Sequence, residues 1–88
     1  MTDTLPRICK VLTDLKLNWT PYGPMQIDPR TTLSDELGMD SMDTIEVAGA
    51  LELEFGIELD DADMWACVEV GDLVNVVDHK REKTKGDR

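Results

Sequence analysis

The residues best suited to chemistry lie in the segment 38–55, GMDSMDTIEVAGALELEF. Their spacing predicts a helix that begins at Ser41, with Asp40 as its N-cap and Asp43 three residues further on. In that arrangement the carboxylates reach the free backbone N–H groups of the first turn, and the Ser41 hydroxyl stands in the positive field of the helix start. A phosphate attached there would meet unpaired N–H donors and a favourable dipole.

The same helix is predicted to have two apolar faces. At about 100° per residue, one arc forms an ordinary core stripe. This stripe consists of Thr44, Val47, Ala48, Leu51 and Phe55. The second arc, roughly opposite, consists of Met42, Ile45, Gly49 and Leu53, with Glu46 and Glu52 beside it. An apolar face with an acidic border has the composition of a docking surface for partners, although scattered exposed apolar residues are also normal on proteins.

No catalytic arrangement accompanies Ser41 in the sequence. A nucleophilic serine needs a general base, usually histidine, and an oxyanion hole. The only histidine, His79, falls at the end of the last predicted helix, and nothing in the sequence pairs it with Ser41. The acidic run DDAD lacks the ligand spacing and turn glycine of an EF-hand, and no His/Cys ligand pattern occurs. The sequence therefore predicts neither an enzyme nor a metal site.

Size and composition predict one domain over residues 1–88, with residues 81–88 as a frayed basic tail. Eighty-eight residues, 41% of them hydrophobic, suffice for a single compact core. Cys9 and Cys67 are expected to be buried, reduced thiols rather than a disulfide. No segment is long enough to span a membrane and no signal-peptide pattern opens the chain, so the expected location is cytoplasmic.

The negative charge is concentrated in one part of the chain. The formal net charge is −10, and residues 28–78 hold 15 acidic residues and a single basic one, Arg30. Such a surface repels nucleic acid and anionic membranes, and it steers the protein toward partners with basic patches. The simpler interpretation is that the negative charge only keeps the protein soluble. We expect partner proteins, no nucleic acid, no membrane, and a monomer.

Periodicity and turn residues predict an all-α chain, a small bundle of four helices. The helices are expected at about 4–17, 41–55, 61–66 and 69–80, with Gly56 ending the second and Asp60 or Asp61 capping the third. Between the first two, the segment 18–32 contains three of the four prolines and reads as a long loop. It is expected to pack back on the bundle through four side chains, Trp19, Tyr22, Met25 and Ile27. A binding platform made of Trp19 and Tyr22 is the alternative.

The run LGMDSMDTIEVAGALELEFGIEL, preceded by IDPRTTLSDE and followed by VEVGDLVNVV, resembles the acyl carrier proteins over roughly residues 5–78. The segment Asp40-Ser41-Met42 corresponds to the family's Asp-Ser-Leu. The resemblance implies a four-helix bundle of acyl-carrier type with a long loop after the first helix and a short third helix. It also implies that Ser41, flanked by Asp40 and Asp43, carries 4′-phosphopantetheine, whose thiol holds an acyl group as a thioester.

The resemblance further implies the partners. A phosphopantetheinyl transferase, with Mg²⁺ in its own active site, would move the arm from coenzyme A to the serine. Enzymes that load and process acyl or aminoacyl groups would then dock through basic patches. The implied recognition face consists of Met42, Ile45, Glu46, Gly49, Glu52 and Leu53.

Several residues depart from the family pattern and leave the pathway open. Gly49 stands where a large apolar contact is common, and Leu53 where an acidic residue is usual. Trp65 and Cys67 are unusual near the third helix, where they indicate either a pocket or ordinary repacking. Three hypotheses follow: an acyl carrier of fatty-acid or polyketide type, a carrier of an amino acid or other small carboxylate loaded by a dedicated ligase, or an unmodified acidic helical adaptor.

Overall fold

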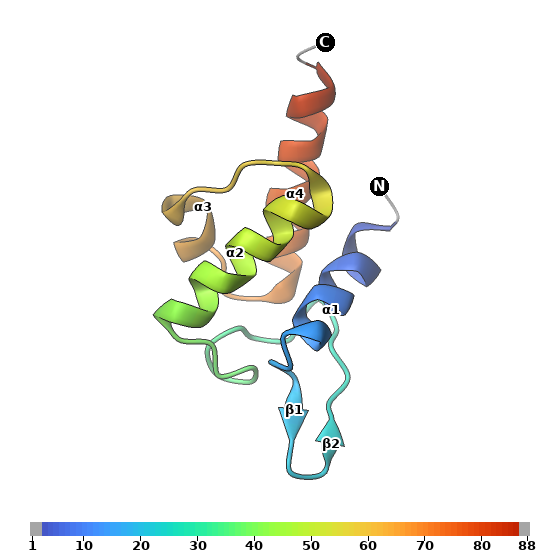
Figure 1. Ribbon diagram of the computed structural model, residues 1–88, viewed down its shortest axis with the longest axis vertical. Coiled ribbons are helices and arrows are strands. Elements are labelled where there is room, and N and C mark those ends of the chain that lie inside the picture. Colours follow the sequence, from blue (N-terminus) through green and yellow to red (C-terminus); the bar gives the residue numbers. More distant parts are fainter. Residues whose placement is uncertain (1–2, 87–88) are drawn as a thin grey trace.

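Four helices and one small hairpin make up the chain in the computed structural model, which describes residues 3–86, with side chains as far as residue 82 (Figure 1). The helices are α1 (Thr4–Asp14), α2 (Ser41–Phe55), α3 (Asp61–Trp65) and α4 (Val70–Gly86). The strands β1 (Trp19–Thr20) and β2 (Gly23–Pro24) pair antiparallel in the connection between α1 and α2. The predicted four-helix architecture with a short third helix is confirmed.

The core lies where the apolar stripes of α1, α2 and α4 meet. The least exposed apolar side chains, at 0–1%, are Ile8, Leu12, Val47, Leu51, Val70, Leu73 and Val77. Burial of each such aliphatic side chain is worth about 1.5–3 kcal/mol. The predicted core stripe of α2 is confirmed for four of its five residues, because Ala48 and Phe55 also pack against this core. The fifth, Thr44, is only half-buried. Within residues 3–86, no helix combines the length and the apolar character that crossing a membrane requires.

Helix α1 ends at Asp14, three residues before the predicted end at residue 17. Lys16 adopts a left-handed backbone conformation, with φ 60°, which stops the helix. Beyond it, Asn18 exchanges hydrogen bonds with Met25. Its side-chain amide donates to the Met25 carbonyl oxygen at 2.8 Å, and the Met25 N–H donates to the Asn18 carbonyl oxygen at 2.7 Å. These contacts close the base of a hairpin that the sequence pattern does not predict.

The hairpin projects from the bundle rather than folding back on it (Figure 1). Trp19 is 53% exposed and Tyr22 is 98% exposed, so the prediction that these two side chains anchor the loop is wrong. Trp19 pairs with Pro24 in this hairpin, and Figure 1 shows both strands beyond the end of α1 rather than between the helices. Met25 and Ile27, in contrast, pack against the core as predicted.

Backbone hydrogen bonds to the start of α4 hold the rest of the long connection in place. Val70 N–H donates to the Thr31 carbonyl oxygen at 2.9 Å, and Gly71 N–H donates to the Pro29 carbonyl oxygen at 2.8 Å. A β-carbon on Gly71 would lie 3.0 Å from that Pro29 oxygen, so a larger residue there would force the two segments slightly apart. The loop is therefore ordered mainly by main-chain pairing.

Helix α4 runs from Val70 to Gly86, so its predicted end near residue 80 is wrong. Asp72 in its first turn accepts the backbone N–H groups of Val68, at 2.9 Å, and Glu69, at 3.0 Å. These two hydrogen bonds lower the pKa of the Asp72 carboxyl. Fraying of residues 81–88 stays a prediction, and residues 87 and 88 lie outside the described part of the chain.

Two glycines of α2 are expected to respond oppositely to alanine. Gly56 ends the helix with φ 66°, a conformation that costs a residue with a β-carbon about 1–2 kcal/mol. Gly49 lies within the helix and a β-carbon there would meet nothing within 4 Å. We expect Gly56→Ala to lower the free energy of unfolding by about 1 kcal/mol and Gly49→Ala to raise it by about 0.5–1 kcal/mol. Urea titrations of both variants would measure these changes. Changes of the same sign in the two variants would contradict the different roles assigned to Gly49 and Gly56.

Candidate functional site

The start of α2 is built as a reciprocal capping box. The Asp43 N–H donates to Asp40 Oδ1 at 2.9 Å, and the Asp40 N–H donates to Asp43 Oδ2 at 3.2 Å. Thr44 N–H and its hydroxyl both donate to the Asp40 carbonyl oxygen at 2.9 Å. Ser41 is the first residue of the helix and its side chain is exposed. The predicted N-cap and helix start are confirmed.

Two backbone donors remain available beside the Ser41 hydroxyl. Among the hydrogen bonds found for residues 3–86, none uses the N–H of Ser41 or of Met42. A phosphate ester at Ser41 could accept both, and a hydrogen bond to a charged group contributes about 1.5–3 kcal/mol. Repulsion from the carboxylates of Asp40 and Asp43 opposes this, but solvent-exposed charges about 4 Å apart interact by only about 1 kcal/mol in water. The helix start therefore suits an anion.

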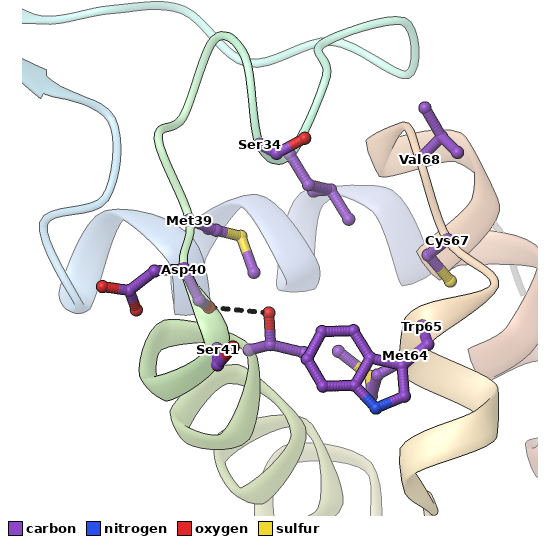
Figure 2. A pocket seen from close by; sticks show the side chains of 10 residues that line it. Ser34, Met39, Asp40, Ser41, Met64, Trp65, Cys67 and Val68 are labelled. Atoms are coloured by element: carbon purple, nitrogen blue, oxygen red, sulfur yellow. Dashed lines mark hydrogen bonds between the residues drawn. The ribbon is translucent and has the colours of Figure 1, made fainter.

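A pocket of about 480 Å³ adjoins the Ser41 hydroxyl (Figure 2). Its walls come from the start of α2, from the turn around residues 33–39, and from α3 with the following residues. Leu33, Met39 and Met64 contribute buried apolar surface. The turn is joined to the opposite wall because Leu33 N–H donates to the Val68 carbonyl oxygen at 2.9 Å.

Helix α3 presents Trp65 at this pocket. Asp60 caps the helix in a second capping box with Asp63, and Lys80 of α4 forms a 3.2 Å ion pair with Asp63. The backbone hydrogen bond in the capping box and the Lys80 ammonium lower the pKa of the Asp63 carboxyl. In Figure 2 the indole of Trp65 extends from α3 across the pocket toward the start of α2. Trp65 is 58% exposed and Val68 is 61% exposed.

Both cysteines are free and half-buried, so the prediction that the two thiols are buried is wrong in degree. Cys67 lines the pocket, and its thiol donates to the Asp63 carbonyl oxygen at 3.3 Å. Burial, together with the nearby carboxylates of Asp72 and Asp63, raises the pKa of the Cys67 thiol to about 11. Burial also raises the pKa of the Cys9 thiol.

The raised pKa predicts slow alkylation of Cys67. The thiolate is the reactive form, so at pH 8 iodoacetamide should modify Cys67 about 100-fold more slowly than a free cysteine. The rate should then rise about tenfold per pH unit until the pH approaches the pKa of this thiol. Peptide mass spectrometry of timed samples would measure it, with the urea-unfolded protein as control. Equal rates in the folded and unfolded protein would contradict the prediction.

The predicted recognition face lies along the outer side of α2. Met42, Ile45 and Leu53 are 75%, 64% and 88% exposed, and Gly49 has open space above it. Glu46 beside them is exposed. Glu52 differs, because its side chain is half-buried and its Oε2 accepts the Leu59 N–H at 2.8 Å. The structure thus brings the predicted face together next to Ser41, with one of its two carboxylates engaged in holding the following loop.

Six residues of the pocket were not singled out as site residues from the sequence, namely Leu33, Ser34, Met39, Thr44, Met64 and Val68. Only Trp65 and Cys67 had suggested a pocket, because their residue types are unusual near the third helix. No local signal identifies Val68, since its position depends on the pairing of residues 29–33 with the start of α4. Within residues 3–86, no group of three or more histidines, cysteines or carboxylates is gathered to hold a metal ion.

Known proteins resemble this chain over most of its length. The family model described as the phosphopantetheine attachment site matches residues 17–77. A putative mitochondrial acyl carrier protein of Schizosaccharomyces pombe is 36% identical over 75 residues, which are 85% of this chain and 64% of that protein. An acyl carrier protein of Thermotoga maritima is 38% identical over 55 residues, which are 62% of this chain and 68% of that protein. The chain therefore spans about two thirds of the length of these relatives.

A solved structure supports the fold independently. The crystal structure of an acyl carrier protein from Thermotoga maritima matches with a TM-score of 0.76, covering 94% of this chain and 92% of that chain at 23% identity. The exposed serine hydroxyl, the two free N–H donors and the adjoining pocket fit a group held through a phosphate ester. The chain belongs to the acyl carrier protein family, whose members are carriers rather than enzymes and whose covalent cofactor is 4′-phosphopantetheine.

Proposed function

We propose that Ser41 is the residue that carries 4′-phosphopantetheine, and that the chain is a discrete carrier of acyl intermediates of the fatty-acid or polyketide type. The observation that carries this proposal is the exposed Ser41 hydroxyl at the capped start of α2, beside two free N–H donors. When bound, the arm supplies a thiol that holds the acyl group as a thioester.

The residues of this chain prepare the attachment without catalysing it. The Ser41 oxygen forms a bond to the phosphorus of the coenzyme A pyrophosphate that carries the pantetheine, while its proton is lost to the transferase. The bond from that phosphorus to the bridging oxygen breaks, and adenosine 3′,5′-bisphosphate leaves. The capping box between Asp40 and Asp43 holds the first turn rigid, so the hydroxyl stays at one place for the transferase. The free N–H groups of Ser41 and Met42 would then stabilise the phosphate charge that remains on the chain.

We propose that partner enzymes dock on the outer face of α2 through apolar and basic groups. Met42, Ile45 and Leu53 offer exposed apolar area, and Glu46 offers a charge at its border. Tethering raises the concentration of the bound intermediate at each partner active site, so docking itself need only be weak. Weak docking suits a carrier that must leave each enzyme after one step.

Reversing the charge of Glu46 tests this docking face. We expect Glu46→Lys to lower the second-order rate of loading by a phosphopantetheinyl transferase about three- to tenfold at low salt, because a rim charge mainly affects association. The difference should shrink as salt is raised. Glu82→Lys, an equal charge change on an exposed residue of α4, is the matched control. An equal loss in both variants would point to net charge instead of a docking face.

Intact-mass spectrometry tests the proposed attachment directly. The purified chain would be incubated with coenzyme A, Mg²⁺ and a transferase of broad specificity. We expect the mass to increase by one phosphopantetheine group, carried by the peptide that contains Ser41. An unchanged mass, or a modification of another peptide, would overturn the proposal.

The location and the carried group are further parts of the proposal. We propose a cytoplasmic monomer, as the sequence predicts, while one relative is named as a mitochondrial protein. Cell fractionation with an antibody would test the location. Recovery of the thioester-bound group from cells would identify the cargo, and an amino acid in place of a fatty acyl chain would overturn the fatty-acid or polyketide assignment.

A further inference from the structure

We infer that Gly49 forms a notch in the outer face of α2 that receives one large apolar side chain of a partner enzyme, next to a basic residue of that enzyme. This makes Gly49 a specificity-determining residue, because only partners with such a side chain fit. The inference rests on the proposed carrier function and its docking face, and it adds what a partner must present there.

The first argument is that nothing within the chain explains a glycine at this position. Gly56 needs a left-handed backbone, and Gly71 lies against the Pro29 carbonyl oxygen. Gly49 lies inside α2, is not among the glycines with positive φ, and a β-carbon there would meet nothing within 4 Å. Glycine inside a helix lowers stability relative to alanine. A residue that weakens its own helix without a local reason is typical of a functional site.

The second argument is that Gly49 interrupts a row of large apolar side chains. Residues four apart lie beside one another on a helix surface, so Ile45, Gly49 and Leu53 form one row along α2. Ile45 and Leu53 are 64% and 88% exposed, and between them the row falls back to the helix backbone. A partner side chain that enters this gap would contact both apolar neighbours and the backbone of Gly49.

The third argument is the charge around the notch. Glu46 and Glu52 are three residues from Gly49 on either side, so they flank it on the helix surface. Glu46 is exposed, whereas Glu52 is half-buried and holds the Leu59 N–H. A lysine or arginine beside the inserted side chain would complement these charges, with Glu46 as its main contact. A second copy of this chain, with its net charge of −10, would bring like charges together here instead.

The apolar surface continues beyond the notch. Leu53 also lines a groove of about 280 Å³ between α1 and α2, together with Leu15 and Ala50. Leu53 therefore borders two hollows, and a partner that packs around it would bury apolar area in both. Exposed apolar side chains that border a concave surface are typical of an interaction site.

Filling the notch tests the inference. Gly49→Met would place a large side chain in the gap, and it should raise the urea midpoint of unfolding because methionine favours a helix more than glycine does. We nevertheless expect the second-order rate of loading by a phosphopantetheinyl transferase to fall about tenfold, because the side chain of the enzyme loses its place. On a face that was only apolar, the added side chain would leave loading unchanged or make it faster.

The kinetic parameters show where the loss arises. Gly49 lies about two turns, or about 12 Å along the helix axis, beyond Ser41, so it does not touch the reacting group. We expect KM to rise about tenfold while kcat stays within about twofold. The loss should persist at high salt, unlike that of Glu46→Lys, because it is steric. Asn75→Met, which adds the same side chain at an exposed position of α4, is the matched control and should load like the unmutated chain.

The outcomes separate this inference from the proposed function. If no mass is added to the unmutated chain, attachment at Ser41 fails and the inference fails with it. If that chain loads and Gly49→Met loads as fast or faster, or if Asn75→Met slows loading equally, the notch fails while attachment at Ser41 stands. Should Gly49→Met fold poorly, Gly49→Ala replaces it, with an expected loss of about twofold in loading at a raised urea midpoint. A rate equal to that of the unmutated chain would then overturn the inference.

Discussion

Replacement of Ser41 by alanine is expected to abolish loading with 4′-phosphopantetheine completely. Without the side-chain oxygen no phosphate ester can form at this position, and the Thr44 hydroxyl in the same helical turn is engaged in a hydrogen bond to the Asp40 carbonyl oxygen. The fold should survive, because Ser41 is exposed and alanine is a good helix former. We expect its free energy of unfolding to change by less than about 0.5 kcal/mol.

The chain contains its own control for this experiment. Ser34 is the only other serine, it is exposed, and it lines the same pocket. Ser34→Ala should therefore be loaded to the same extent as the unmutated chain when both are followed by intact mass. Residual loading of Ser41→Ala, or lost loading of Ser34→Ala, would assign the arm to another residue.

Leu51→Ala is expected to have the largest effect on stability. Leu51 is 0% exposed at the centre of the core, and truncation of such a leucine costs about 2–5 kcal/mol through lost burial and a residual cavity. Domains of this kind have a total stability of about 5–15 kcal/mol, so this loss would leave part of the protein unfolded or close to unfolding. Urea unfolding followed by circular dichroism measures it.

Leu53→Ala is the matched control, two residues further along the same helix. Leu53 is 88% exposed, so its truncation should change the free energy of unfolding by less than about 0.5 kcal/mol. Its effect should appear in partner docking instead, as slower loading by the transferase. Comparable destabilisation by both variants would contradict the division of α2 into a core face and an outer face.

Helix α2 could be predicted closely because its signals are local. Asp40 and Asp43 are three residues apart, which is the spacing that a capping box requires, and Gly56 stands where the helix needs a left-handed residue. The two faces follow from helical periodicity alone. The Ser41 hydroxyl was therefore assigned to an exposed helix start from the sequence, together with its flanking carboxylates.

Other elements were predicted less well because distant contacts decide them. The end of α1 depends on the pairing of Asn18 with Met25, which also creates the hairpin and leaves Trp19 exposed. The aromatic side chains of Trp19 and Tyr22 suggest anchors, but backbone N–H groups at the start of α4, which donate to the carbonyl oxygens of Thr31 and Pro29, order the loop instead. The residue type shows that a side chain is apolar, but it does not show whether the fold offers that side chain a surface to pack against.

The sequence by itself determined the helix that presents Ser41, its caps, its two faces and the acidic character around it, because each depends on residues within a few turns of one another. Only the tertiary structure decided that a pocket lies beside that serine. Its walls come from a turn after the hairpin, from α2 and from α3, and they meet because main-chain groups more than 30 residues apart pair with one another. No local pattern encodes such pairing, so Trp65 acquires its place beside Ser41 only when the chain folds.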